Sequence, residues 1–518
     1  MRKSWKLLSL LALLFTLGCE GLAPSRALDL PGQSAQPGPQ DQTGQGKAFR
    51  FRWVKCDYGN LPVEIDCGHL TVPVNRTDPQ GGKTRLEVTI LRSQGPSSGS
   101  SAPTAEPLLV LAGEPGSAAT LDIQSWLENP LLKKRDLILV DLRGTGNSEP
   151  SLNCTEIDES GDLSNSKEVS ACRRRLEGKS IDLGQFTSAQ SAADLDDLRQ
   201  ALGYEKWDVL GISYGTRLAL TLLRDHPQGV RSLVLDSVYP PEVNIFEEQA
   251  VNGARAIQDF FTGCHQDPEC QYGYPDLEQV YDDLIASLDK DPRQVMVADP
   301  RTGEARMILL DGRQMTELIV EALNNPETLA RIPYLIYETH YGNDHAVAGL
   351  MFPGSGSPAG GSAEQDKDER RAFAEGAFYS VLCAEEMPFN NRGLAEAAAR
   401  QPDLPLARLL YGPVESLFDR CQDWKAPKAG QIETQPVSSA IPALILSGEY
   451  DPLTPPGWAE QAAQGLSGSR VLEFPAAGHS VLSLGDCPLE IVGEFLDNPS
   501  GPLDTACIND LQVEYWLP

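Results

Sequence analysis

Basic residues and histidines are scarce in this chain of 518 residues. It has 43 Lys and Arg against 73 Asp and Glu, which gives a formal net charge of −30, and it has only six His. Such a charge would be repelled by a phosphate backbone or an anionic membrane surface, so it argues against nucleic acid as a partner. Hydrophobic residues make up 41 % of the chain and charged residues 22 %, as in an ordinary globular protein.

Other patterns are absent as well. The sequence has no C-x-x-C pair, and its histidines do not cluster with its cysteines. Zinc sites are built from such spacings, so we predict no metal and no cofactor. We find no internal repeat, and no apolar run beyond the N-terminus is long enough to span a bilayer.

The first 18 residues have the pattern of a signal peptide. Three basic residues among the first six precede an apolar run from Leu7 to Leu17, which is too short to cross a membrane. The following Gly18-Cys19 resembles the end of a bacterial lipobox, although Thr16 stands where Leu is preferred. We therefore expect Cys19 to be lipidated, the alternative being a plain cleaved signal. The prediction is an exported protein of a bacterial envelope, lipid-anchored at the outer membrane or periplasmic face, or else periplasmic or secreted.

Ten cysteines remain once Cys19 is set aside, an even number that suits an oxidising compartment. They fall into pairs of close neighbours in the sequence, so pairing of nearest neighbours is the simplest hypothesis, although spacing alone does not fix connectivity. The predicted pairs are Cys56/Cys67, Cys154/Cys172, Cys264/Cys270, Cys383/Cys421 and Cys487/Cys507.

The chain divides by pattern. Residues 19–50 are rich in Gly, Pro, Gln and Ser and are predicted to be a flexible tether. Beyond them, short apolar runs alternate with helical patterns such as Asp194–Leu202, which predicts an α/β fold with a parallel sheet covered on both faces. Residues 242–430 look mostly helical. We therefore predict one α/β domain in two parts, 51–241 and 431–518, split by an inserted helical cap. The predicted strands include Leu86–Leu91, Pro107–Leu111, Asp136–Asp141, Trp207–Leu210, Ser232–Leu235, Ala443–Ser447 and Val471–Phe474.

A G-x-S-x-G motif, Gly211–Gly215, lies between a predicted strand and the apolar helix Thr216–Leu223. This context is typical of a nucleophile elbow, in which the glycines permit a sharp turn that presents the serine at the top of the sheet. The helix N-terminus beneath the turn favours negative charge. We predict Ser213 as the nucleophile.

A serine nucleophile needs a base and a carboxylate that orients the base. Among the histidines, His226 lies late in the helix after Ser213, and His69 is expected to precede the main sheet. His479 follows the last predicted strand, where the chain order Ser…Asp…His places the base. Asp451, just past the end of a strand, is the predicted orienting acid, and Glu449 is its rival. The other histidines fall in the insertion: His265, His340 and His345.

The tetrahedral intermediate of acyl transfer needs backbone N–H donors. One is expected to be the amide of Tyr214, the residue after the nucleophile. The second is expected from the loop after the strand that ends at Leu111, where Gly113 and Glu114 are the candidates.

These motifs together resemble the α/β-hydrolase superfamily, and more narrowly the exported tripeptidyl aminopeptidase and proline iminopeptidase group with a tripeptidyl-aminopeptidase-like C-terminal region. The resemblance implies an α/β-hydrolase fold with a cap and a serine peptidase activity. One departure stands out: the typical oxyanion loop is H-G-G-P-G, whereas Ala112–Gly116 reads A-G-E-P-G, which puts a carboxylate beside the developing oxyanion. The segments that carry the resemblance are Trp53–Pro73 (W-x-x-C…C-G-x-L-x-V-P), Asp141–Ser148 (D-x-R-G-x-G-x-S), Gly211–Gly215, Gly448–Pro455 (G-x-x-D-x-x-T-P), and Gly478-His479 followed by Cys487 and Cys507.

The resemblance also implies a substrate class. In this group acidic residues of the insertion bind the free α-ammonium of the peptide, and Cys383–Glu386 resembles the C-x-[DE] segment. It implies Glu385 as the ammonium ligand and Glu386 as the second candidate; the alternative is a solvated helix face. We expect release of one to three residues from the N-termini of peptides through an acyl-enzyme on Ser213. A carboxylesterase with the same triad is the alternative, and a non-catalytic lipoprotein on the same scaffold is a third.

Overall fold

The computed structural model describes residues 49–59, 61–93, 105–157, 166–298, 305–347 and 371–517. The predicted signal peptide, Cys19 and nearly all of the predicted tether lie outside the described residues. Within the described ranges no helix combines the length and the apolar character needed to cross a membrane.

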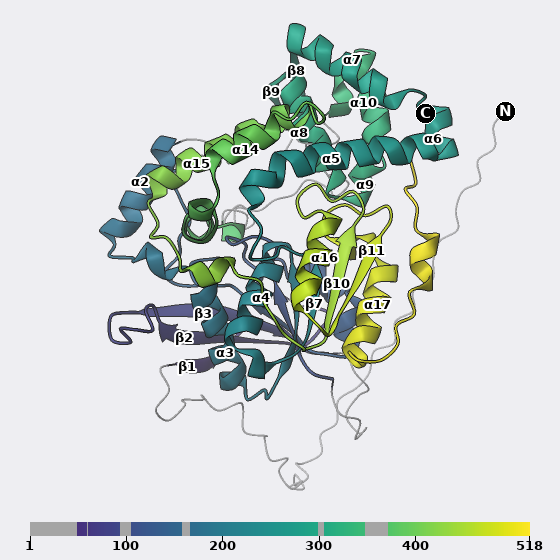
Figure 1. The fold of residues 1–518 in the computed structure, drawn as a ribbon. Coiled ribbons are helices and arrows are strands. Elements are labelled where there is room, and N and C mark those ends of the chain that lie inside the picture. The colour runs from purple at the N-terminus through teal and green to yellow at the C-terminus, as the bar shows by residue number, and fades with distance from the viewer. Residues whose placement is uncertain are drawn as a thin grey trace, which may run out of the picture. The chain divides into compact units, whose positions relative to one another are not determined.

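A nine-stranded sheet forms the centre of the structure (Figure 1), with the strand order β1-β2-β3-β5-β4-β6-β7-β10-β11. Neighbouring strands are parallel from β5 to β11, whereas β1, β2 and β3 form an antiparallel edge. The strands are β1 (Arg50–Val54), β2 (Ile65–Pro73), β3 (Lys83–Leu91), β4 (Leu108–Leu111), β5 (Leu137–Val140), β6 (Trp207–Ile212), β7 (Val230–Asp236), β10 (Ala443–Gly448) and β11 (Ser469–Phe474).

The predicted α/β fold is confirmed, and each apolar run predicted as a strand overlaps one of β3 to β7, β10 or β11. Strands β1 and β2 are additional, because their half-exposed, mixed sequences lack the continuous apolar runs of strands that helices cover on both faces. The prediction that His69 precedes the main sheet is therefore wrong: His69 lies in β2, where it pairs with Glu87 of β3.

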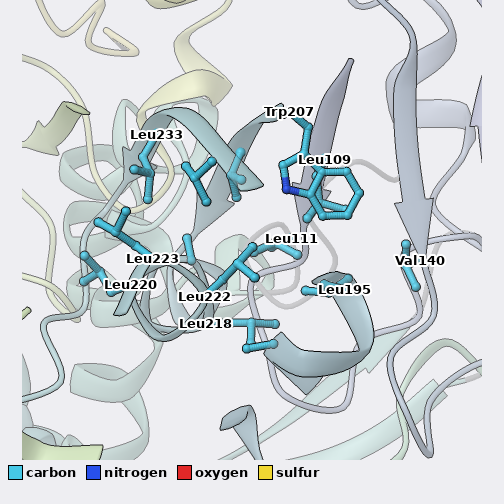
Figure 2. Packing of buried hydrophobic residues seen from close by; sticks show 14 of the residues in the cluster. Leu109, Leu111, Val140, Leu195, Trp207, Leu218, Leu220, Leu222, Leu223 and Leu233 are labelled. Atoms are coloured by element: carbon cyan, nitrogen blue, oxygen red, sulfur yellow. The ribbon is translucent and has the colours of Figure 1, made fainter. Parts of the chain in front are cut away.

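Alternating strand residues face two apolar layers. Val209 of β6 packs in a cluster with helices α3, α4 and α16, whereas its neighbour Leu210 packs in another with α1 and α17. Figure 2 shows the first layer, in which leucines of α4 lie against side chains of the sheet. The labelled residues are Leu109, Leu111, Val140, Leu195, Trp207, Leu218, Leu220, Leu222, Leu223 and Leu233.

The helices outside the region between β7 and η7 either connect strands of the sheet or follow its last strand, β11. They are α1 (Gln124–Leu127), η1 (Pro130–Lys133), α2 (Ser166–Gly178), η2 (Leu183–Gln185), α3 (Ser188–Leu202), α4 (Tyr214–Asp225), η3 (Pro227–Gly229), η7 (Gln431–Thr434), α16 (Pro456–Gly465), η8 (Val481–Leu484), α17 (Asp486–Asp497) and η9 (Ala506–Asp510).

Between β7 and β10 the chain forms a helical region with its own apolar core, which Figure 1 shows to one side of the sheet. A two-stranded antiparallel hairpin, β8 (Arg293–Ala298) and β9 (Ala305–Leu310), interrupts the helices and was not predicted. The helices are α5 (Ile245–Gln266), α6 (Pro268–Gly273), α7 (Leu277–Lys290), α8 (Gly312–Leu323), α9 (Pro326–Leu329), α10 (Ile332–His340), η4 (Asp344–Val347), α13 (Glu375–Val381), η5 (Leu382–Glu386), η6 (Met387–Phe389), α14 (Arg392–Ala399) and α15 (Ala407–Trp424).

Five disulfides join the cysteine pairs that the nearest-neighbour hypothesis predicts: Cys56–Cys67, Cys154–Cys172, Cys264–Cys270, Cys383–Cys421 and Cys487–Cys507. Each closes a short loop, the longest spanning 38 residues between Cys383 and Cys421. That disulfide attaches the turn that holds Glu385 and Glu386 to helix α15.

Candidate active site

Ser213 occupies a strained turn between β6 and α4. Its backbone has φ 52° and ψ −121°, a conformation that non-glycine residues seldom adopt outside functional sites. The turn has no room for side chains on either flank, because a Cβ at Gly211 would lie 2.4 Å from the Gly215 carbonyl oxygen, and one at Gly215 would lie 2.3 Å from the Leu111 carbonyl oxygen. The local structure is therefore the predicted elbow, with Ser213 immediately before the helix N-terminus.

Asp451 and His479 form a close pair at the carboxyl ends of β10 and β11. His479 Nδ1 donates to Asp451 Oδ2 at 2.9 Å and to Oδ1 at 3.1 Å, and the rival Glu449 does not take this place. The Asp451 carboxylate is fully buried and also accepts from both the N–H and the hydroxyl of Thr454. A bond at Nδ1 selects the tautomer that leaves Nε2 free to accept a proton.

The pair shifts the pKa of each partner. Burial opposes the charged imidazolium, but the Asp451 carboxylate outweighs it and raises the pKa of His479. Burial likewise disfavours the Asp451 carboxylate, yet His479 and the Thr454 bonds hold the pKa of Asp451 below its usual value. The geometry and the charges therefore both suit a base oriented by a carboxylate.

Two polar residues, Asp236 at the end of β7 and Ser237 directly after it, join the serine turn to the histidine loop, and sequence reasoning missed both. The backbone carbonyl of Asp236 accepts from the Ser213 N–H at 2.9 Å. Its carboxylate accepts from the N–H groups of Val481 at 2.7 Å and Leu482 at 3.1 Å. The Ser237 hydroxyl accepts from the N–H of Ser480 at 2.8 Å. A polar Asp-Ser pair that ends an apolar strand was the available signal.

Asp236 is fully buried, and this burial raises its pKa to about 6 despite the two N–H donors. Through Asp236, the turn that carries Ser213 and the loop that carries His479 share one support. The structure therefore brings the three predicted catalytic residues to the same edge of the sheet, where parallel strands end.

The insertion closes on this edge. The Leu323 carbonyl, at the end of α8, is so close to Gly478 that a Cβ there would lie 1.6 Å from its oxygen. Arg255 of α5 donates to the backbone carbonyl of Asp451 at 2.8 Å. Helices of the insertion thus contact the backbone of both the His479 loop and the Asp451 turn.

The loop predicted to supply oxyanion donors lies beside Ser213. A Cβ at Gly113 would lie 3.7 Å from the Ser213 Cβ. The Tyr214 N–H, one of the two expected donors, donates to the Gly113 carbonyl at 3.1 Å. Glu114 is exposed to solvent, and neighbouring protein atoms partly desolvate its carboxyl group. This environment raises the pKa of Glu114; the nearby Glu321 of α8 adds to the shift and His479 opposes it.

Glu385 and Glu386, the predicted ammonium ligands, lie in the π-helical turn η5. Their exposed fractions are 1 % and 4 %, so the alternative of a solvated helix face is wrong. The Glu385 carboxylate accepts from the N–H and the hydroxyl of Ser188, both at 2.6 Å. The Glu386 carboxylate pairs with Arg217 Nε at 2.8 Å and accepts from the Tyr239 hydroxyl. In this structure both carboxylates therefore already have hydrogen-bond or ion-pair partners within the protein.

Glu385 is linked to the first residue of α4, because the Ser188 hydroxyl that it binds also hydrogen-bonds the Tyr214 hydroxyl at 2.7 Å. Burial raises the pKa of Glu385 to about 7, with Arg217 opposing the shift. An ammonium role for Glu385 or Glu386 stays a prediction. In the described part of the chain, no group of three or more His, Cys, Asp or Glu is arranged to hold a metal ion.

The chain is similar in sequence to known hydrolases. Residues 106–268 match the family described as alpha/beta hydrolase fold, and residues 412–507 match the family described as TAP-like protein. Serine protease Hip1 of Mycobacterium tuberculosis (strain ATCC 25618 / H37Rv) is 25 % identical over 534 residues, 96 % of each chain. Carboxylesterase B of the same strain is 26 % identical over 550 residues, 98 % of this chain and all of that one. Tripeptidyl aminopeptidase of Streptomyces coelicolor is 30 % identical over 211 residues, 36 % of this chain and 38 % of that one.

Proposed function

The chain belongs to the α/β-hydrolase superfamily as a serine hydrolase with a TAP-like C-terminal region, and we propose that it is an exported aminopeptidase that releases one to three residues from peptide N-termini. The observation that carries the proposal is the buried Asp451–His479 pair at the sheet edge where the strained turn presents Ser213. Relatives named serine protease and tripeptidyl aminopeptidase support peptides as the substrate class.

The proposed reaction uses these residues in the order of acyl transfer. Ser213 Oγ attacks the peptide carbonyl carbon while His479 Nε2 takes the hydroxyl proton. The C–N bond then breaks, and His479 returns the proton to the leaving amine. Water then gives a proton to His479 and attacks the acyl carbon, the bond to Ser213 Oγ breaks, and His479 returns the proton to Ser213 while the N-terminal fragment leaves with a free carboxylate. Asp451 keeps the imidazole oriented and stabilises its charged form.

Two features favour a substrate with a free ammonium group. Helices α5 and α8 of the insertion contact the loops of Asp451 and His479, and a cap at this edge of the sheet suits a substrate that enters by its chain end. Glu114 and Glu321 are exposed to solvent. Their negative potential favours a substrate that presents a cationic N-terminus over one that presents an acidic group. Glu385 and Glu386 could contact such an ammonium only if they gave up their present partners.

The deciding experiment compares peptide p-nitroanilides with free and acetylated N-termini. An aminopeptidase should lose most of its kcat/KM when the amine is blocked, and the length of the released fragment, measured by mass spectrometry on a peptide mixture, gives the step size. Equal turnover of both substrates would sink the aminopeptidase proposal. Covalent labelling of Ser213 by a fluorophosphonate, with Ser213→Ala as control, tests whether the chain is catalytic at all.

A carboxylesterase is the second candidate, because the relative named carboxylesterase B matches nearly the whole chain. The triad proposed here cleaves esters and amides alike. An esterase should hydrolyse p-nitrophenyl acyl esters with a kcat/KM far above its value for any peptide anilide and should ignore the state of the amine.

We also propose that the protein is exported and lipidated at Cys19. Five disulfides within the described residues suit an oxidising compartment. Metabolic labelling with an alkynyl fatty acid should mark the protein, and Cys19→Ser should remove the label without loss of hydrolase activity. Label that persists in the variant would contradict lipidation at this cysteine.

A further inference from the structure

The hydrogen bond between Tyr214 and Gly113 occupies the position where a tetrahedral intermediate needs a donor. An oxyanion formed on attack by Ser213 is stabilised by N–H groups directed at it, but the Tyr214 N–H is committed to the Gly113 carbonyl at 3.1 Å. That carbonyl oxygen also brings negative partial charge to the place where negative charge would develop. As it stands, the oxyanion hole is closed.

We infer that the enzyme rests with this hole closed, that rotation of the Gly113–Glu114 peptide opens it, and that Glu114 sets the cost of opening. The inference rests on the proposed function only in taking Ser213 as the nucleophile. In a trans peptide the carbonyl oxygen and the next N–H point in opposite directions. A rotation of about half a turn therefore removes the Gly113 oxygen from Tyr214 and turns the Glu114 N–H toward the same side. One movement frees the first donor and supplies the second.

The surroundings confine the movement to this one peptide. Upstream, β4 ends at Leu111 within the sheet. Downstream, the Ser117 N–H donates to the Glu114 carbonyl at 3.1 Å, and the Gly116 carbonyl accepts from the Ala374 N–H at 2.9 Å. The Gly113–Glu114 peptide lies between these anchors, and neither of the two downstream bonds uses its atoms.

The rotation is costly because of the residue at position 114. Turning a peptide plane changes ψ of the residue before it and φ of the residue after it. Glu114 has a φ outside the positive range in the closed form, and the rotation carries it into that range. A residue with a Cβ is disfavoured there by roughly 5- to 30-fold relative to glycine, and the following Pro115 restricts Glu114 further. The typical H-G-G-P-G loop has glycine at this position, so the glutamate holds the loop closed.

Glu114 is thus a positioning residue that acts through its backbone. The test is Glu114→Gly, which removes the Cβ, compared with Glu114→Gln and Glu114→Ala, which remove the charge but keep the Cβ. The readouts are kcat/KM for a peptide p-nitroanilide, the inhibition constant of a peptidyl boronic acid, and the rate of Ser213 labelling by a fluorophosphonate. The boron atom accepts the Ser213 oxygen, the hydroxyl proton passes to His479, and the resulting tetrahedral adduct needs the open hole.

We expect Glu114→Gly to raise kcat/KM and to tighten the boronic acid by roughly 5- to 30-fold, with binding of a product peptide unchanged. Glu114→Gln and Glu114→Ala should not reproduce this gain. Equal gains in all three variants would assign the effect to charge and overturn the backbone argument. No gain in Glu114→Gly, with its melting temperature near that of the wild type, would overturn the closed hole.

A matched variant tests the same rotation from the other side. A Cβ at Gly113 would have no neighbour nearer than 3.7 Å, so Gly113→Ala fits the closed form and should fold normally. It should lower kcat while leaving product binding intact, because alanine narrows the ψ change that glycine allows. Full activity of Gly113→Ala would contradict the rotation. If the aminopeptidase proposal fails, the labelling comparison still decides this inference, because it needs only the Ser213 nucleophile.

Discussion

The two parts of the candidate active site differ in whether their hydrogen bonds already suit the proposed reaction. On the proton-transfer side, Asp451 and His479 are already hydrogen-bonded, and Asp236 holds the backbone of both the Ser213 turn and the His479 loop. On the oxyanion side, the Tyr214 amide still donates to the Gly113 carbonyl. Preorganised donors are a large source of rate enhancement in acyl transfer. Under the proposed mechanism, the resting enzyme is therefore limited by charge stabilisation rather than by its base.

Ser213→Ala should have the largest effect of any substitution. It removes the proposed nucleophile, and losses in kcat of about 10⁶-fold are known for such changes. The melting temperature should stay close to that of the wild type, because the Ser213 contact that supports the turn is its backbone N–H to Asp236. Substantial remaining peptidase activity in a pure preparation would remove Ser213 from the mechanism.

Asp451→Asn should lower kcat by about 10⁴-fold at neutral pH, as expected when the base loses its orienting carboxylate. The base must be neutral to accept a proton, and the pKa of His479 is raised above 6.5. The acid limb of the wild-type kcat/KM profile should therefore have its midpoint above pH 6.5.

The variant should move that midpoint downward, because the carboxylate that favours the imidazolium is gone. The same pair contributes to the stability of the fold at pH values below the unfolded pKa of His479, and this contribution is lost as the pH rises through the folded pKa. An unchanged midpoint in Asp451→Asn would show that the profile reports another group.

Asp236→Asn tests whether the positions of Ser213 and His479 depend on the hydrogen bonds that Asp236 makes to both loops. An amide has one acceptor oxygen where the carboxylate offers two to Val481 and Leu482, so one buried N–H loses its acceptor at a cost of about 1–3 kcal/mol. Displacement of the His479 loop should lower kcat by roughly 10- to 100-fold.

Ser237→Ala is the matched control. It removes the bond from the Ser480 N–H and the long 3.4 Å bond from the Ser237 hydroxyl to Asp236 Oδ1, but it leaves both carboxylate oxygens of Asp236 in place, so it should have a smaller effect on kcat. The readouts are thermal melting and kcat at saturating substrate. If Asp236→Asn lost stability but kept its kcat, the support would serve the fold alone.

The same contrast explains what the sequence could predict. Ser213, Asp451 and His479 lie in short motifs at strand ends, and strand order places such ends together, so local patterns suffice for them. The Asp236 support and the Tyr214–Gly113 bond join residues far apart in the chain, and no local pattern encodes either contact. The prediction for Glu385 and Glu386 rested on a short acidic motif, and a motif carries no information on whether a carboxylate is buried against Ser188 or Arg217.

Glu385→Gln has the smallest expected effect on activity. It decides whether this carboxylate only supports Ser188 and Tyr214 or also binds the substrate ammonium. Glu385 accepts two hydrogen bonds from Ser188, whose hydroxyl also contacts the Tyr214 hydroxyl. Glutamine offers a single acceptor oxygen, so the variant should lose about 1–3 kcal/mol of stability, seen as a lower melting temperature. If Glu385 acts only as a support, kcat/KM should fall by the same small factor for free-amine and acetylated substrates. An increase in KM confined to the free-amine substrate would instead make Glu385 an ammonium ligand, and the insertion would then have to open further than the present contacts show.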